Sequence, residues 1–225
     1  MMPTLTLRPA QAVLFDLDGT LLDSRTSHYR VYQHVFADLG IRFDHAVFTQ
    51  HYSPNWYLLY ERIGLPRDRW PEADQLWLHY YEQETPGPRT GAGQVLAAVK
   101  GSRRALGLVT SGERARVERD LDRLGWVALF DAVVCGGDAP RMKPHPDPLR
   151  LALSQLNLSP RAAVYVGDTI EDVQMGKAAG TATVALAGGF SSHETLSGER
   201  PDILLDSLAE LTPLLQPIDN QKIDN

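Results

Sequence analysis

Short apolar runs alternate with segments of helical spacing along most of the chain. The run at residues 12–15 has no helical period and is typical of a strand buried on both faces. From Gly91 onward, a helical pattern separates each apolar run from the next, which predicts a parallel sheet covered by helices. The chain is therefore expected to have an α/β fold with a Rossmann-like parallel sheet. We expect strands at 105–109, 132–135, 163–166, 183–186 and 203–205, and helices at 92–99, 113–124, 148–156, 170–179 and after the last strand.

The segment 25–88 has a different pattern, because its apolar residues recur at helical spacing and no strand-like alternation occurs. Glycine and proline residues mark helix ends and helix starts in this segment, and three helices are expected from them. The sequence Pro86-Gly87-Pro88 is typical of a linker. We therefore predict a discontinuous core at 1–24 and 89–215, an inserted α-helical domain at 25–88, and a polar tail at 216–225.

Composition limits the class of protein further. The chain has 225 residues, of which 43% are hydrophobic, and no run approaches the ~20 apolar residues of a membrane span. The amino terminus lacks the basic and apolar regions of a secretion signal, and the single cysteine, Cys135, fits a reducing compartment. The net charge is −6 and no basic cluster stands out, which argues against a nucleic-acid partner. We expect a cytoplasmic enzyme, monomeric or homodimeric, with no nucleic-acid or membrane partner.

Two carboxylates follow the first expected strand directly. Asp16 and Asp18 are two residues apart, so their side chains would leave the strand end side by side. Such carboxylates repel each other unless a cation or a shared proton relieves them. A lone Asp-x-Asp-Gly sequence would be explained as well by a turn that closes a strand. The full string D-L-D-G-T-L-L-D-S is more specific, and it resembles the nucleophile motif of the haloacid dehalogenase superfamily of phosphotransferases.

Three further motifs similar to those of this superfamily follow in order, each at the end of an expected strand. The segment 108–111 is similar to the second motif, a hydrophobic strand ending in Thr or Ser. The segment 141–148 opens a K-P-x-P loop with Lys143, as the third motif does. The segment 166–172 resembles the fourth motif, G-D-x-x-x-D, although Asp168 alone would also be explained as a helix N-cap. The resemblance covers residues 13 to about 211.

These residue types suit phosphoryl transfer. A carboxylate can attack phosphorus, a second can supply the proton that the leaving group needs, and a hard cation such as Mg²⁺ neutralises the approaching phosphate. The resemblance implies that Asp16 is the nucleophile and a Mg²⁺ ligand, and that Asp18 is the general acid and base with its backbone carbonyl on the metal. The aspartate at position 18 also implies phosphate chemistry rather than dehalogenation. The remaining implied roles are phosphoryl binding by Thr110 and Lys143, substrate binding by the adjoining Ser111 and Gly112, and metal binding by Asp168 and, directly or indirectly, Asp172.

The helical insert resembles the cap of the phosphoglycolate phosphatase and β-phosphoglucomutase subgroup, which closes over the substrate. The mutase-like members have a histidine where His28 stands, five residues after Asp23, so the resemblance makes His28 a candidate substrate-binding residue. A surface histidine would explain His28 equally well. The insert holds 13 of the 18 aromatic residues, with Tyr52, Trp56 and Tyr57 grouped around His51 and Asn55. Most of these rings are expected in the core of a helical bundle, and some are expected to line a roof over the site.

Three functions are open from the sequence. The favoured one is a Mg²⁺-dependent, phosphoglycolate phosphatase-like hydrolase of a small phosphomonoester that acts through an aspartyl-phosphate intermediate. The alternatives are a β-phosphoglucomutase-like sugar phosphomutase and a non-catalytic scaffold on the same fold. A mutase needs cations in its cap for the far phosphate, whereas this insert has six arginines, no lysine and eight acidic residues. We therefore expect hydrolysis. We also expect esters whose leaving groups can pack on aromatic rings to be preferred to very small substrates such as phosphoglycolate.

Overall fold

One parallel sheet forms the centre of the molecule. The computed structural model describes residues 10–215, and its six strands lie in the order β3-β2-β1-β4-β5-β6. All neighbouring strands pair in parallel, which confirms the expected α/β fold with a Rossmann-like sheet. Strands β2 and β3 are added on one side of β1, and β4 to β6 on the other. The boundary between β1 and β4 is therefore the point where the strand order switches, and such sheets bind ligands there. The strands are β1 (Ala12–Phe15), β2 (Ala105–Glu113), β3 (Ala132–Gly136), β4 (Ala163–Gly167), β5 (Ala182–Leu186) and β6 (Ile203–Leu205).

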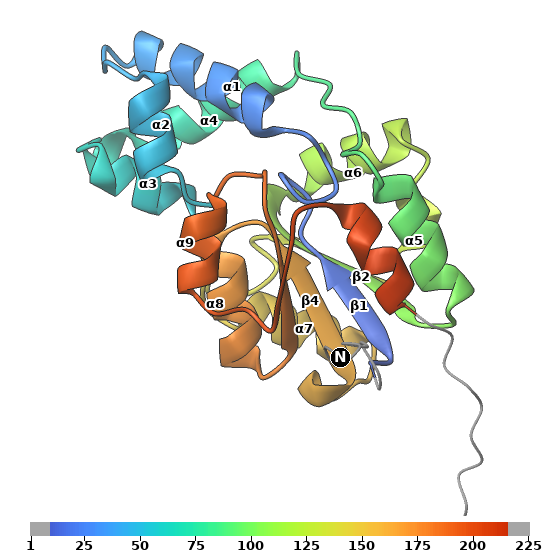
Figure 1. The fold of residues 1–225 in the computed structure, drawn as a ribbon. Coiled ribbons are helices and arrows are strands. Elements are labelled where there is room, and N and C mark those ends of the chain that lie inside the picture. Colours follow the sequence, from blue (N-terminus) through green and yellow to red (C-terminus); the bar gives the residue numbers. More distant parts are fainter. Residues whose placement is uncertain (1–9, 216–225) are drawn as a thin grey trace, which may run out of the picture.

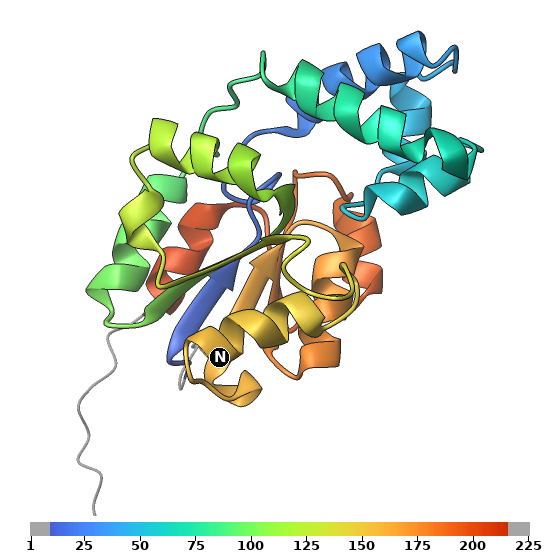
Figure 2. The same cartoon turned by 180° about the vertical axis from the view of Figure 1, so that it is seen from behind.

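Helices cover both faces of the sheet (Figures 1 and 2). The four residues of β1 alternate between the two faces, as extended backbone requires. Val13 and Phe15 join the hydrophobic cluster under α5 and η4, whereas Ala12 and Leu14 join the cluster under α7 and α8. All four are fully buried. The helices around the sheet are α5 (Ala92–Gly101), α6 (Arg114–Arg123), α7 (Asp147–Gln155), α8 (Ile170–Ala179), α9 (His193–Gly198) and the 3₁₀ helices Val127–Leu129, Pro160–Ala162 and η4 (Leu208–Leu214).

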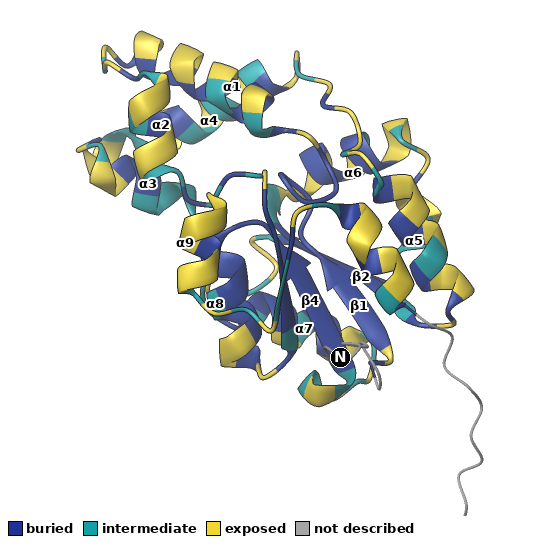
Figure 3. Cartoon of the chain, viewed as in Figure 1, coloured by how far each residue is buried: buried dark blue, intermediate teal, exposed yellow. Residues whose placement is uncertain are grey.

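The helical insert lies over the carboxyl ends of the strands (Figure 1). Its helices are α1 (Arg25–Asp38), α2 (His45–His51), α3 (Trp56–Arg62) and α4 (Trp70–Tyr81), with the 3₁₀ helix Arg67–Arg69 before α4. Their inner surfaces form one largely aromatic cluster, and the helices are buried on that side and exposed on the other (Figure 3). Phe190, from the loop after β5, also belongs to this cluster, so the insert packs directly on the core. We refer to residues 25–88 as the cap, and their division from the core as a domain stays a prediction.

Several element boundaries differ from those expected. The cap has four α-helices instead of three. The additional one is the seven-residue α2, whose N-cap Asp44 accepts the N–H groups of Ala46 and Val47. Strand β2 continues to Glu113, and α6 begins only at the next residue because Glu113 is its N-cap. Helix α9 was not expected, and the last helix is a 3₁₀ helix with Pro213 inside it.

The polar tail expected at 216–225 lies outside the described residues. Between residues 10 and 215, none of the helices combines the length and the apolar character needed to cross a membrane.

Candidate active site

The backbone brings the two central acidic motifs to one edge of the sheet. Phe15 pairs with Val166 in the last register position of β1 and β4, so Asp16 and Asp168 leave adjacent strands at the same end. The turn after Asp16 requires glycine at position 19, where φ is +82°. A Cβ atom there would lie 2.3 Å from Asp168 Oδ2, so this turn reaches the carboxylate only because the residue has no side chain.

Three carboxylates form a buried acidic cluster at this edge. One oxygen each from Asp16, Asp168 and Asp172 lies within 4.8 Å of the others, and all three residues are buried. Burial raises the pKa of Asp16 and of Asp168 well above the usual range, and the charge of Asp172 adds to both shifts. The acidic cluster therefore gathers three predicted metal ligands where water screens their repulsion poorly.

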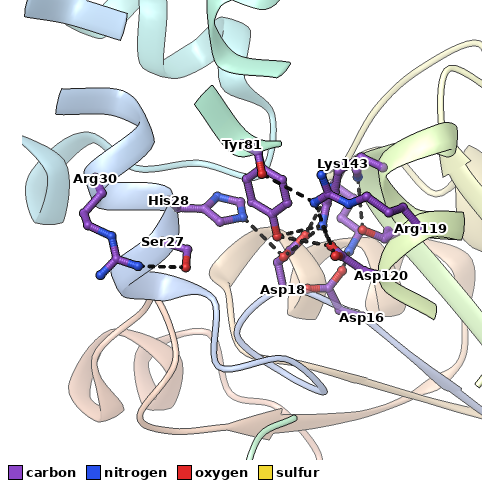
Figure 4. A network of polar contacts seen from close by, with 12 residues as sticks. Asp16, Asp18, Ser27, His28, Arg30, Tyr81, Arg119, Asp120 and Lys143 are labelled. Carbon is purple, nitrogen blue, oxygen red and sulfur yellow. Dashed lines mark hydrogen bonds and ion pairs between the residues drawn. The ribbon is translucent and has the colours of Figure 1, made fainter. Parts of the chain in front are cut away.

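Lys143 is the cation that faces this acidic cluster. Its Nζ donates to Asp16 Oδ1 at 2.6 Å and to Asp172 Oδ1 at 2.8 Å (Figure 4 shows the first contact). Both carboxylates raise the pKa of the lysine although burial lowers it. One lysine leaves most of the charge of three carboxylates uncompensated, and an all-oxygen donor set suits a hard divalent cation. The residues present therefore fit a Mg²⁺ site.

Neighbouring hydrogen bonds hold the acidic cluster in place. Asp168 accepts from the Thr20 hydroxyl at 2.7 Å and from the Phe190 N–H at 2.7 Å. Asp172 accepts from the N–H and hydroxyl of Thr169, at 3.0 and 2.6 Å. Thr169 is the N-cap of α8, so the interpretation of Asp168 as a helix N-cap is wrong.

Asp18 points away from the acidic cluster. Its two carboxylate oxygens accept from Arg116, at 3.1 Å from Nη1 and 2.6 Å from Nη2, and its Oδ1 lies 3.2 Å from His28 Nε2 (Figure 4). Burial alone would raise the pKa of Asp18, but Arg116 and His28 outweigh it and hold this pKa well below the usual range. The structure thus brings His28 to Asp18, while a metal contact through the Asp18 backbone carbonyl stays a prediction.

Arg116 is the residue at this site that sequence reasoning missed. It lies in the first turn of α6, is 6% exposed, and packs over the ring of Tyr81 at 4.9 Å. A Cβ atom at Gly112 would lie 2.0 Å from Arg116 Nη2, so the glycine leaves room for the guanidinium to reach Asp18. The available signal was an Arg-x-x-x-Asp pair, Arg116 and Asp120, directly beside the apolar positions of an amphipathic helix.

A cavity of about 480 Å³ connects the strand ends with the cap. Asp16 and Asp18 lie at its strand end together with Thr110, expected to bind the phosphoryl group, and with Ser111 and Gly112, expected to bind the substrate. Thr110 Oγ1 accepts the Gly112 N–H at 3.0 Å, which orients the hydroxyl. The cap end is lined by His28, by Asp74 and by six aromatic residues, Tyr32, Tyr52, Trp56, Tyr57, Tyr60 and Trp77.

The expected aromatic roof is therefore present in part. Tyr52, Trp56 and Tyr57 line the cavity as expected, whereas His51 and Asn55 are not among the residues that line it.

The cap also contacts the core beside the cavity. The Ser53 hydroxyl donates to Glu171 Oε1 at 2.7 Å, and the ring of Tyr52 stacks on Phe190 at a centroid distance of 3.9 Å.

The fold and the site together define an α/β enzyme whose cavity has Asp16 and Asp18 at its floor, with Lys143 bonded to Asp16. Comparison with known proteins identifies the family. The sequence profile of the haloacid dehalogenase-like hydrolases matches residues 13–186. The chain is 32% identical to pyrophosphatase PpaX of Bacillus velezensis over 92% of this chain and 97% of that protein. It is 38% identical to a phosphoglycolate phosphatase of Salmonella paratyphi A over 58% of this chain and 52% of that protein.

Solved structures agree with this likeness at the level of the fold. A predicted phosphoglycolate phosphatase from Haemophilus somnus superposes with a TM-score of 0.82 at 23% identity, covering 92% of this chain and 98% of that one. The protein belongs to the haloacid dehalogenase-like hydrolase family, and it is an enzyme of the phosphatase type within that family.

Proposed function

We propose that the protein is a Mg²⁺-dependent phosphatase that hydrolyses a small phosphomonoester through an aspartyl phosphate at Asp16. The observation that carries this proposal is the position of Asp16. Its carboxylate belongs to the acidic cluster, accepts from Lys143 at 2.6 Å, and lies at the cavity floor beside Thr110. A nucleophile at this place meets the phosphorus of any ester whose phosphoryl group enters the strand end.

The reaction has two displacement steps. In the first, an Asp16 oxygen forms a bond to phosphorus while the bond between phosphorus and the ester oxygen breaks, and Asp18 gives a proton to the departing alkoxide. In the second, water attacks the same phosphorus, Asp18 accepts its proton, and the bond to Asp16 breaks. The products are the alcohol and inorganic phosphate, and the enzyme returns to its starting state.

Lys143 and Thr110 stabilise charge on the phosphoryl oxygens. An ammonium group and a hydroxyl that are already oriented cost little reorganisation when charge spreads over these oxygens. Asp16, Asp168 and Asp172 would hold Mg²⁺, with the backbone carbonyl of Asp18 as a further ligand. When bound, Mg²⁺ neutralises the phosphoryl group and the acidic cluster together.

Arg116 is proposed to position Asp18. A carboxyl group whose pKa lies far below neutrality is a poor proton donor, so Asp18 must exchange part of its contact with Arg116 for the leaving-group oxygen. His28, 3.2 Å from the same carboxylate, keeps Asp18 near the cavity during this exchange. The closure of the cap over the substrate is the step at which the exchange would occur.

A sugar phosphomutase is less well supported. A mutase holds a second phosphate in the cap, which requires a free cation there. Arg116 is the arginine that lines the cavity, and both of its terminal nitrogens already bind Asp18. The third possibility, a non-catalytic scaffold, does not fit an enzyme that keeps Asp16, Lys143 and Asp168.

The test is a phosphate-release screen with and without Mg²⁺. The panel contains phosphoglycolate, pyrophosphate, β-glucose 1-phosphate, nucleotides and larger alkyl and aryl phosphates. The proposal predicts Mg²⁺-dependent release from at least one monoester, abolished by EDTA. Conversion of β-glucose 1-phosphate to glucose 6-phosphate would overturn hydrolysis in favour of the mutase, and turnover that is indifferent to EDTA would overturn the metal site.

A further inference from the structure

The cap end of the cavity contains a carboxylate that lacks a cationic partner. Asp74, on α4, lines the cavity and accepts hydrogen bonds from Tyr57 at 3.0 Å and from Tyr60 at 3.1 Å. Both donors are neutral, and no lysine, arginine or histidine of residues 10–215 forms an ion pair with it. Burial raises the pKa of Asp74, as expected for a charge with no cation to offset the loss of water.

Aromatic rings surround this carboxylate. Six rings line the same end of the cavity, contributed by α1, by the loop between α2 and α3, by α3 and by α4. The face of an aromatic ring carries negative electrostatic potential, which attracts a cation, most strongly when the cation carries little water. A neutral apolar group would also pack against the rings, but it would leave the charge of Asp74 without a cation.

The cavity offers nothing equivalent for an anion at this end. Its cationic or potentially cationic lining residues are Arg116 and His28, and both contact Asp18. A second phosphate or a carboxylate at the cap end would face the charge of Asp74 without a counter-charge. The two ends of the cavity therefore have opposite preferences, for an anion at the strands and for a cation under the cap.

His28 and Trp77 show that these two ends are close together. Their ring centroids lie 5.3 Å apart, and His28 Nε2 lies 3.2 Å from Asp18 Oδ1. Trp77 follows Asp74 by three residues on α4, so it lies about one helical turn from the cap carboxylate. A substrate that places one charge at each end needs only a short chain between them.

We propose that the cap end of the cavity is an ammonium-binding site, formed by Asp74 and the surrounding rings. The proposal rests on the phosphatase function proposed above and narrows its substrate to the phosphomonoesters of short amino alcohols. The phosphoryl group lies at Asp16, and the alkylated or free ammonium group of the alcohol lies against Asp74, Trp77 and Trp56.

The first experiment compares two esters of the same shape. They are choline phosphate and its neutral isostere, in which a tert-butyl group replaces the trimethylammonium group. The ammonium site predicts a kcat/KM for choline phosphate that is higher by about tenfold or more, a preference that a cation–π contact combined with an ion pair can supply. Equal or better turnover of the neutral ester would overturn the proposal, and this comparison needs no variant.

A variant then assigns the preference to its residue. Asp74→Asn removes the charge but keeps an acceptor for the tyrosines, and it should reduce kcat/KM for choline phosphate about tenfold more than for the isostere. The matched control is Asp68→Asn, which makes the same charge change at an exposed cap residue outside the cavity and should keep the wild-type ratio. Equal losses for both esters in Asp74→Asn would contradict the ammonium site.

Binding separates this proposal from the phosphatase function. Calorimetric titration of Asp16→Asn with each ester measures selectivity without turnover. Tighter binding of choline phosphate with no phosphate release by the wild type would support the ammonium site and refute the phosphatase function. Phosphate release by the wild type without selectivity in either experiment would refute the ammonium site and leave the phosphatase function standing.

Discussion

The core and the cap contribute to one cavity by different physical means. On the core side, Asp16, Lys143 and Asp168 are buried ionisable residues, fixed by strand ends and short hydrogen bonds. On the cap side, rings and a single carboxylate come from α1, α3, α4 and the loop between α2 and α3, and hydrophobic packing holds them together. The core is therefore built for a reaction at phosphorus, whereas the cap is built to select what is attached to it.

The largest expected effect is the loss of kcat when the nucleophile of the core is removed. Asp16→Asn keeps the shape of the side chain but removes the nucleophile, and it should reduce kcat by about a thousandfold or more. Phosphate release under saturating substrate measures it, with circular dichroism to verify folding. Asp122→Asn, an exposed aspartate of α6, is the matched control and should retain wild-type activity. A comparable loss in both variants would show that the effect is not specific to the site.

The next largest effect is expected at Arg116, which contacts Asp18 of the core and Tyr81 of the cap. Arg116→Gln should reduce kcat/KM about tenfold to a hundredfold for alkyl phosphates and much less for p-nitrophenyl phosphate, since a good leaving group needs no proton from Asp18. Arg119→Gln is the control, because Arg119 also packs over Tyr81, at 5.4 Å, without touching Asp18. Equal losses on both esters in Arg116→Gln would mean that Arg116 acts on the phosphoryl group instead of on Asp18.

A third prediction concerns the pH dependence of stability, to which the buried carboxylates of the core contribute and the rings of the cap do not. Burial, with the charge of Asp172, raises the pKa of Asp168 to about 7 in the metal-free protein, above the ~4 of an unfolded chain. The folded state then binds more protons, so the free energy of unfolding should rise as the pH falls from about 8 to about 6.

Mg²⁺ should reverse this dependence, since it binds the ionised carboxylates and stabilises only the folded protein. At pH about 8, millimolar Mg²⁺ should raise Tm by roughly 5 °C. Asp168→Asn should largely remove this rise and weaken the pH dependence, to which Asp16 also contributes. Thermal denaturation with Mg²⁺ or EDTA measures this. A Tm that is unaffected by Mg²⁺ at pH about 8 would contradict a metal site in the acidic cluster.

The smallest expected effect lies in the cap. Ser53→Ala removes the hydrogen bond to Glu171 that holds the cap against the core, at a cost of about 1 kcal/mol to the closed form. We expect KM to rise a few-fold while kcat changes little, because Ser53 touches no reacting atom. Ser197→Ala, at an exposed position of α9, is the control. A loss confined to kcat would instead assign Ser53 to the chemistry.

The sequence predicted the core well because its information is local. Asp16 and Asp168 each directly follow a short apolar strand, and Thr110 follows the apolar part of β2. Parallel strands necessarily bring such residues to one edge. The short helices α2 and α9 were missed because six or seven residues give too little periodicity to detect.

The cap and its contacts depend on packing between distant segments, which a single sequence does not reveal. Its aromatic content predicted a roof, but not that Asp74 would be the charged residue among the rings. Arg116 was missed for a similar reason. It is separated by 98 residues from Asp18, and only the tertiary fold makes them partners.

The most direct test of the account is to trap the phosphorylated enzyme. Wild-type protein is mixed with a radiolabelled substrate and Mg²⁺, quenched in acid during turnover, and digested for mass spectrometry. The account predicts a phosphate on Asp16 that is stable in acid, released by hydroxylamine, and absent from Asp16→Asn. Phosphate on a different residue would contradict the account. So would an Asp16→Asn variant that turns over substrate as fast as the wild type.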